Sequence, residues 1–288
     1  MNTRPGDADK LFVLVHGSFH GAWAFEKLAP LLVREGHQVI ARDLLGHGLR
    51  ARFPRSYLDG TRASEEFPVE PSPLAEISLR DCADPVIATV EDLAQRLPER
   101  RIVLVGHSFA GLVLHAVGEA VPHHLDRLVY LNAFMTASGV PATEYLASDE
   151  FASSALLPLA IGDPMATGAF RIDPRSDDPR YQAGLRTTLA DDVDDDTWQA
   201  VVNLLTPDTP AAPHAEPVTL SADRWGTVPR TYVSCTRDNA FPVDVHRRFV
   251  READEFTPDN VTDVREMASS HSPFWSQPER LAELLLRL

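Results

Sequence analysis

The amino-acid sequence predicts an α/β fold: a sheet of about six mainly parallel strands, helices on both of its faces, and an inserted, mostly helical cap. Two observations carry this prediction. Short runs rich in β-branched and aromatic residues alternate with longer segments that have helical periodicity. Strands separated by helices are typical of a parallel sheet that is covered on both faces. The chain of 288 residues is also long enough to bury a large core without disulfides or metals.

The predicted strands and helices alternate along most of the chain. The segment 79–97 has apolar residues at three- and four-residue spacing, and Gly36 closes an earlier helical segment. The strands are predicted at 11–17, 37–43, 102–105, 125–134, 228–236 and 260–267. The helices are predicted at 21–36, at 79–97, directly after Ser108, at 242–253 and at 276–288.

Two segments do not follow this alternation. Residues 46–78 form a proline-rich loop that is longer than the loops of compact domains, and both a lid and a tolerated surface insertion remain open for it. Residues 135–226 separate two predicted strands and hold amphipathic pieces divided by Asp/Pro turns. We therefore expect a core domain made of residues 1–134 and 227–288, with residues 135–226 inserted as a cap.

Composition excludes several classes of partner. The formal net charge of −15 leaves no basic footprint for nucleic acid or an anionic membrane. Only Cys82 and Cys235 occur, which indicates neither a disulfide framework nor a metal site. The polar start and the absence of an apolar run near 18 residues predict a cytoplasmic protein with no signal peptide and no membrane span. A monomer and a homodimer both remain open.

The segment around Ser108 carries the first sign of chemistry. Four apolar residues run into Gly106-His107-Ser108-Phe109-Ala110-Gly111, and a helical pattern follows. A strand, a sharp turn with serine at its apex and a helix form the nucleophile elbow, whose pattern is G-x-S-x-G. The fifth position holds Ala110 in place of glycine, a departure of one methyl group that we expect to be tolerated. We predict that Ser108 is a nucleophile.

A serine nucleophile needs a base, and the base needs an orienting acid. Proteins with this elbow present the three groups in the order serine, acid, histidine. Among 11 histidines, His271 alone follows the last predicted strand and is the expected base. Asp238 lies in the loop directly after the strand 228–236 and is the expected acid, with Asp244 as the second choice.

Stabilisation of an oxyanion requires two backbone donors. The N–H groups of Phe109, next to the serine, and of Ser18, in the loop after the first strand, are the expected pair. These loops all follow strands and should meet at the carboxyl edge of the sheet. The residues expected to line a substrate pocket are Phe19, Trp198, Phe274 and Trp275.

Taken together, these motifs resemble the α/β-hydrolase superfamily, and more narrowly its methyl esterases, salicylate-binding esterases and hydroxynitrile lyases. The matching pieces are "VLVHGSFHGAW", "GHQVIARDLLGHG", "IVLVGHSFAGL", "RTYVSCTRDNAFP" and "HSPFWSQPERLAELL". The resemblance covers most of the chain except the loop 46–78 and much of the predicted cap. It implies an α/β-hydrolase fold.

The same resemblance separates two chemistries. The lyases of this group carry a threonine after the histidine of the first loop and a lysine after the catalytic histidine, where this chain has Gly17 and Ser272. The expected function is therefore a serine carboxylic-ester hydrolase that acts on a small to medium apolar or aromatic ester through an acyl-enzyme. No cofactor and no metal are expected. The alternative is a non-hydrolytic use of the scaffold, as a biosynthetic tailoring or lyase step or as a small-molecule binding protein.

Overall fold

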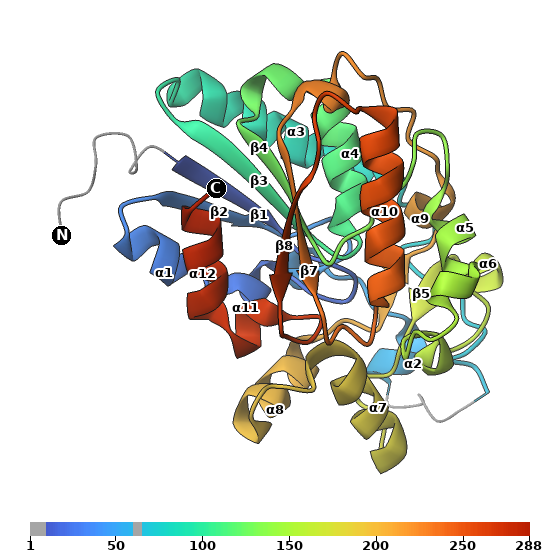
Figure 1. Cartoon of the computed structure of the whole chain (residues 1–288). Helices are drawn as coiled ribbons and strands as arrows, with labels where there is room; N and C mark the ends of the chain where they lie inside the picture. The colour runs from blue at the N-terminus through green and yellow to red at the C-terminus, as the bar shows by residue number, and fades with distance from the viewer. Residues whose placement is uncertain (1–9, 60–64) are drawn as a thin grey trace.

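A computed structural model describes residues 10–59 and 65–288 (Figure 1). The predictions made for residues 1–9, the polar start, and for residues 60–64 of the loop 46–78 fall outside the described residues. The main sheet has six strands, and every neighbouring pair in it is parallel. In chain order they are β1 (Lys10–Val15), β2 (Gln38–Arg42), β3 (Arg101–His107), β4 (Arg127–Leu131), β7 (Arg230–Cys235) and β8 (Asp263–Met267).

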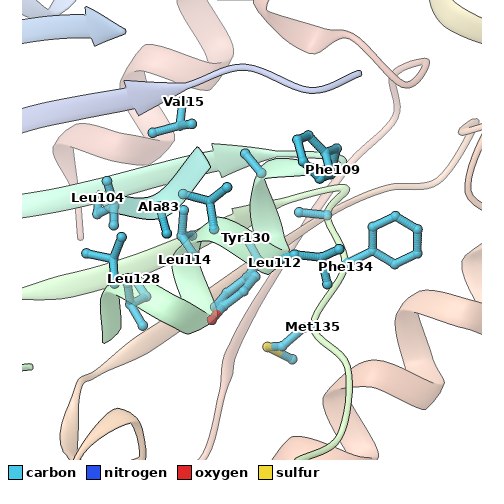
Figure 2. Close-up of a cluster of buried hydrophobic side chains, with 14 of the residues drawn as sticks. Val15, Ala83, Leu104, Phe109, Leu112, Leu114, Leu128, Tyr130, Phe134 and Met135 are labelled. Carbon is cyan, nitrogen blue, oxygen red and sulfur yellow. The ribbon is translucent and has the colours of Figure 1, made fainter. Parts of the chain in front are cut away.

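Alternate residues of the strands fill two separate cores, one on each face of the sheet. On one face, Val13 and Leu104 pack with the helices α3 (Leu79–Arg96), α4 (Ala110–Ala120) and α10 (Val243–Phe256). On the other face, Phe12 and Val103 pack with α1 (Ala29–Arg34) and α12 (Pro278–Leu286). Figure 2 shows part of the first core, where Leu104 and Tyr130 of the sheet lie near Leu114 of α4. The α/β fold with helices on both faces is confirmed.

Prolines lie at the starts of several helices, and one of the predicted helices is divided. The segment 21–36 contains a 3₁₀ turn, η1 (Ala22–Phe25), and then the short α1, whose first turn includes Pro30. The predicted C-terminal helix 276–288 is present as α12, which begins at Pro278, and the short α11 (Pro273–Ser276) precedes it. Proline has no N–H to donate and is therefore favoured in the first turn of a helix, although α3 also accommodates Pro85 within its length.

Residues 135–226, which we call the inserted segment, lie between the neighbouring strands β4 and β7. The regular structure of the segment is mainly helical, as predicted, but it also contains an antiparallel hairpin of β5 (Ala169–Arg171) and β6 (Asp208–Pro210). Three-residue strands, one of which ends in proline, give no alternating pattern for a sequence to reveal. Its helices are α5 (Ala142–Leu146), α6 (Pro164–Thr167), α7 (Pro179–Ala190), α8 (Asp195–Leu204) and α9 (Ala212–Ala215). The division into two domains remains a prediction.

The described part of the loop 46–78 is held against the inserted segment. The loop contains the short helix α2 (Arg55–Leu58), and the Ser72 N–H donates to the Thr167 carbonyl at 2.7 Å. The buried guanidinium of Arg171 donates to the carbonyls of Phe67 and Glu70. Its remaining contacts form a bidentate pair with Asp208, at 2.7 and 2.8 Å. The remaining 3₁₀ turns are η2 (Gly48–Arg50), η3 (Pro122–His124), η4 (Asp149–Phe151), η5 (Leu157–Leu159) and η6 (Trp225–Thr227).

The order of the strands predicts where a ligand binds. Across the sheet the strands run β2-β1-β3-β4-β7-β8, so the chain moves outward from β1 to β2 and then returns to β3 on the other side of β1. Such a reversal opens a crevice at the carboxyl ends of the two central strands. The strands point toward the end of the molecule where α7 and α8 lie (Figure 1). Within the described ranges, every helix is too short or too polar to cross a membrane.

Candidate active site

Ser108 lies at the junction of β3 and α4, in a backbone conformation that is rare for residues with a side chain. Its φ is +54°, and its main chain is fixed on both sides: the Ser108 N–H donates to the Leu131 carbonyl, and the Ser108 carbonyl accepts from the Phe134 N–H. A strained residue held in this way is characteristic of functional turns and costs about 1–3 kcal/mol. The predicted strand-turn-helix around Ser108 is present.

Close packing around the turn accounts for the missing glycine of the motif. A Cβ atom added at Gly106 would lie 2.4 Å from Leu114, and one at Gly111 would lie 1.9 Å from the Phe134 carbonyl oxygen. The methyl group of Ala110, by contrast, is accommodated in the first core. The steric requirement for glycine therefore falls on positions 106 and 111, and alanine at position 110 is tolerated.

His271 and Asp238 form a buried hydrogen-bonded pair. The Nδ1 of His271 lies 2.7 Å from Oδ2 of Asp238, and both side chains are almost fully buried. The other carboxylate oxygen accepts from the N–H groups of Ala240 and Phe241, each at 2.8 Å. Asp238 is thus held by its own loop while it orients the imidazole. The second choice, Asp244, is exposed in α10 and pairs with Arg247.

Two further side chains, which the sequence motifs did not predict, fix the main chain of His271. Asn132, at the end of β4, and His107, at the end of β3, each donate to the His271 carbonyl at 3.0 Å. Asn132 has a φ of +44° and also accepts from the Cys235 N–H at 2.7 Å. Asparagine tolerates left-handed backbone better than most residues, and this preference was the only feature of the sequence that could have indicated a special role for Asn132.

A second imidazole lies next to the carboxylate. The Nε2 of His246, from α10, is 3.7 Å from Oδ2 of Asp238, and its Nδ1 is 2.9 Å from the Ser234 hydroxyl. Burial lowers the pKa of His246 to about 4, although the charge of Asp238 opposes this. His246 is therefore neutral near pH 7.

The two expected oxyanion donors are available. Among the described residues, no acceptor takes a hydrogen bond from the main-chain N–H of Ser18 or of Phe109. Phe19, next to Ser18, has a φ of +66°, and its carbonyl accepts from the Thr206 N–H of the inserted segment at 2.8 Å. Gly17 lets the first loop approach the turn, because a Cβ there would lie 2.8 Å from that of Ser108.

A cavity of about 240 Å³ brings these loops together. Ser18, Ser108 and His271 line it, together with many apolar side chains. The apolar lining comes mainly from the inserted segment and includes Leu146, Leu156, Leu157, Phe170, Ile172 and Leu189. The site is therefore a largely apolar chamber with the serine and the histidine in its wall.

Of the four aromatic residues expected in the pocket, only Phe19 lines this cavity. Trp198, Phe274 and Trp275 belong to the second core instead. The ring of Trp275 stacks on Trp23 at 5.7 Å, and all three side chains are buried there. Phe274 and Trp275 are close to His271 in sequence, but α11 directs their rings into the second core, on the face of the sheet that α1 covers.

The chain belongs to the alpha/beta hydrolase family, whose model matches residues 12–284. Fold, elbow and family together make it an α/β-hydrolase-type enzyme, as expected. The chain is 27% identical to methylesterase 1 of Arabidopsis thaliana, over 96% of this chain and 95% of that one. It is 29% identical to polyneuridine aldehyde esterase of Rauvolfia serpentina, over 96% and 94% respectively. The names of these relatives agree with the expected carboxylesterase class.

Solved structures give the same grouping. The crystal structure of polyneuridine aldehyde esterase has a TM-score of 0.73 and 25% identity, over 97% of this chain and 98% of that one. A pyrethroid hydrolase from Sphingobium faniae JZ-2 has a TM-score of 0.75 at 22% identity, over 96% of both chains, and shows the shared fold.

Proposed function

We propose that the protein is a serine carboxylic-ester hydrolase with Ser108 as nucleophile, His271 as base and Asp238 as the orienting acid. The substrate class is a small to medium apolar or aromatic ester. The inserted segment acts as a cap that supplies most of the pocket. The observation that carries the proposal is the buried His271–Asp238 pair in the wall of the apolar cavity that Ser108 also lines.

In the first half of the reaction, His271 Nε2 takes the proton from the Ser108 hydroxyl as Oγ attacks the ester carbonyl carbon. Asp238 accepts the hydrogen bond from Nδ1 and so fixes the tautomer that leaves Nε2 free. The N–H groups of Ser18 and Phe109 bind the oxyanion. The tetrahedral intermediate then expels the alcohol, which takes the proton from His271.

In the second half, water attacks the acyl-enzyme. His271 removes a proton from the water, and the same two N–H groups bind the second oxyanion. Collapse of this intermediate returns the proton to Ser108 Oγ and releases the carboxylic acid. Apart from the ester and one water molecule, these steps use side chains and amides of this chain.

The test is hydrolysis of p-nitrophenyl esters, from acetate to octanoate, by the wild type and the Ser108→Ala variant. Removal of the nucleophile should lower kcat by about 10⁴-fold or more, because the base and the acid act only through it. Ser153→Ala, at an exposed serine of the inserted segment, is the matched control and should retain full activity. A Ser108→Ala enzyme that keeps most of its turnover would refute the assignment.

One relative points to the non-hydrolytic alternative. Norfluorocurarine synthase 1 of Strychnos nux-vomica is 29% identical over 96% of this chain. If wild type and Ser108→Ala were equally inactive on every ester while a ligand bound tightly to both, the non-hydrolytic use would replace the proposal. Product analysis by mass spectrometry separates the two, because hydrolysis with ¹⁸O water labels the acid.

A further inference from the structure

Two polar side chains of the inserted segment line the cavity and have no part in the proposed mechanism. They are Thr209 of β6 and His214 of α9. Both are buried, and both lie among apolar neighbours. We call these two residues the polar end of the cavity.

The tautomer of His214 follows from its surroundings. Its Nδ1 lies 3.2 Å from the Pro210 carbonyl oxygen, which can only accept, so Nδ1 carries the proton. Burial lowers the pKa of His214 to about 4, so the ring is neutral near pH 7 and Nε2 holds a lone pair. The rings of Phe109 and Phe170, each 4.8 Å away between centroids, hold the imidazole in place.

The Nε2 atom of His214 faces the cavity. No described residue forms a hydrogen bond with Nε2, and this atom is not fully enclosed by protein. Because the ring lines the cavity, the remaining exposure of this atom is toward the cavity. A neutral acceptor is thus presented to whatever binds there.

Thr209 is restricted in the same way by its neighbour His47. The Nδ1 of His47 lies 3.2 Å from the Leu45 carbonyl and therefore donates to it, which leaves Nε2 as an acceptor. Burial lowers the pKa of His47 to about 4, so the ring is neutral. The Thr209 hydroxyl, 3.1 Å from that Nε2, must then donate to it. Only the lone pairs of the Thr209 oxygen remain for a ligand.

A strong hydrogen-bond donor of the cavity wall is largely engaged elsewhere. Arg171 also lines the cavity, but four of its five N–H groups already bind Asp208, Phe67 and Glu70. The polar end therefore offers acceptors rather than donors.

We propose that Thr209 and His214 form a subsite that selects esters carrying a hydrogen-bond donor, such as a hydroxyl, a phenol or an N–H group. A methyl group at the same place would leave both acceptors without a partner, and a carbonyl or ether oxygen there would face their lone pairs. The proposal rests on the proposed ester hydrolysis and narrows its substrate class. It makes these two residues determinants of specificity.

The test compares methyl esters of phenylacetic and 3-phenylpropanoic acids that carry a hydroxyl, a methyl or a methoxy group at the meta or para position. The hydroxyl group is a hydrogen-bond donor, the methyl group is its apolar isostere, and the methoxy group can only accept a hydrogen bond. For the position that reaches the subsite, the hydroxyl ester should have a kcat/KM about tenfold above that of its methyl isostere, and the methoxy ester should be the poorest.

The variants His214→Phe and Thr209→Val should each bring the hydroxyl-to-methyl ratio of kcat/KM close to one. Phenylalanine keeps the ring among its aromatic neighbours, and valine keeps the shape of threonine. Thr188→Val is the matched control, because the hydroxyl of Thr188 is buried in α7 and donates to the Gly184 carbonyl without lining the cavity, and the variant should preserve the ratio. Circular dichroism checks that each variant is folded.

Binding separates this proposal from the proposed function. Dissociation constants of the same esters for the Ser108→Ala protein, measured by calorimetry, do not depend on turnover. A preference for the hydroxyl esters that His214→Phe removes supports the subsite even if no ester is hydrolysed. Equal binding of the hydroxyl and methyl esters, or a preference that survives both substitutions, would overturn it while leaving ester hydrolysis intact.

Discussion

At the scale of single residues, the site is built from left-handed backbone at the ends of three neighbouring strands. Phe19 after β1, Ser108 after β3 and Asn132 after β4 all have positive φ. The sequence predicted Ser108 because a local motif surrounds it. It did not predict Asn132, whose partners Cys235 and His271 are 103 and 139 residues away. A residue that acts only through distant main-chain groups leaves no local pattern.

The close contact at Gly111 gives a prediction for a single methyl group. Gly111→Ala should lower the free energy of unfolding by about 2–3 kcal/mol, because its Cβ would lie 1.9 Å from a main-chain oxygen. The measurement is urea unfolding followed by circular dichroism. Gly184→Ala, within α7, is the control. The added Cβ would meet only the end of the Leu159 side chain at 3.0 Å, so this substitution should be neutral or stabilising. Equal stability of the two variants would mean that α4 shifts freely away from β4.

At the scale of elements, the strands and long helices were predictable and the inserted segment was only partly so. Runs of buried apolar residues mark β1 and β3, and a capping box at Ser78 marks the start of α3. The hairpin of β5 and β6 has no such mark. Its position depends on the ion pair of Arg171 and Asp208, which also holds the loop 46–78. That pair joins residues 37 positions apart and cannot be read from either strand alone.

Breaking this ion pair should be costly. Asp208→Ala leaves a fully buried guanidinium without its carboxylate and should lower the free energy of unfolding by about 3–5 kcal/mol. Asp195→Ala, which removes the 87% exposed partner of Arg186 in the same segment, should change it by less than about 1 kcal/mol. Urea unfolding measures both, and limited proteolysis reports whether the loop 46–78 is released. Two small, similar losses would show that water or another carboxylate replaces Asp208.

At the scale of the whole molecule, buried neutral histidines tie stability to pH. Burial lowers the pKa values of seven histidines below the usual 6.5: His16, His20, His47, His107, His115, His214 and His246. The unfolded chain therefore binds more protons than the folded one at acidic pH. Their contribution to stability is present above about pH 6.5 and is lost as the pH falls toward 4. Histidine content was visible in the sequence, but burial was not.

The urea midpoint should consequently fall steeply between pH 7 and pH 5, before most carboxylates titrate. His115→Phe tests this away from the active site, since burial lowers the pKa of His115 to about 3 and its ring packs against Tyr130 and Trp225. The variant should reduce the slope of the unfolding free energy by about 1 kcal/mol per pH unit in this range. His123→Phe, at an exposed position, is the matched control. If neither substitution changes the slope, groups other than His115 cause the acid sensitivity.

The hydrogen bond from the Thr206 N–H to the Phe19 carbonyl has a consequence for protein engineering. It connects the inserted segment to the loop that presents the Ser18 amide, so the segment is not an independent module that can be exchanged to alter selectivity. A graft that moves Thr206 would also move a proposed catalytic donor, and turnover would change together with substrate range. Chimaeras made with other hydrolases should therefore keep residues 205–207 with the parent sheet and place their junctions farther inside the segment.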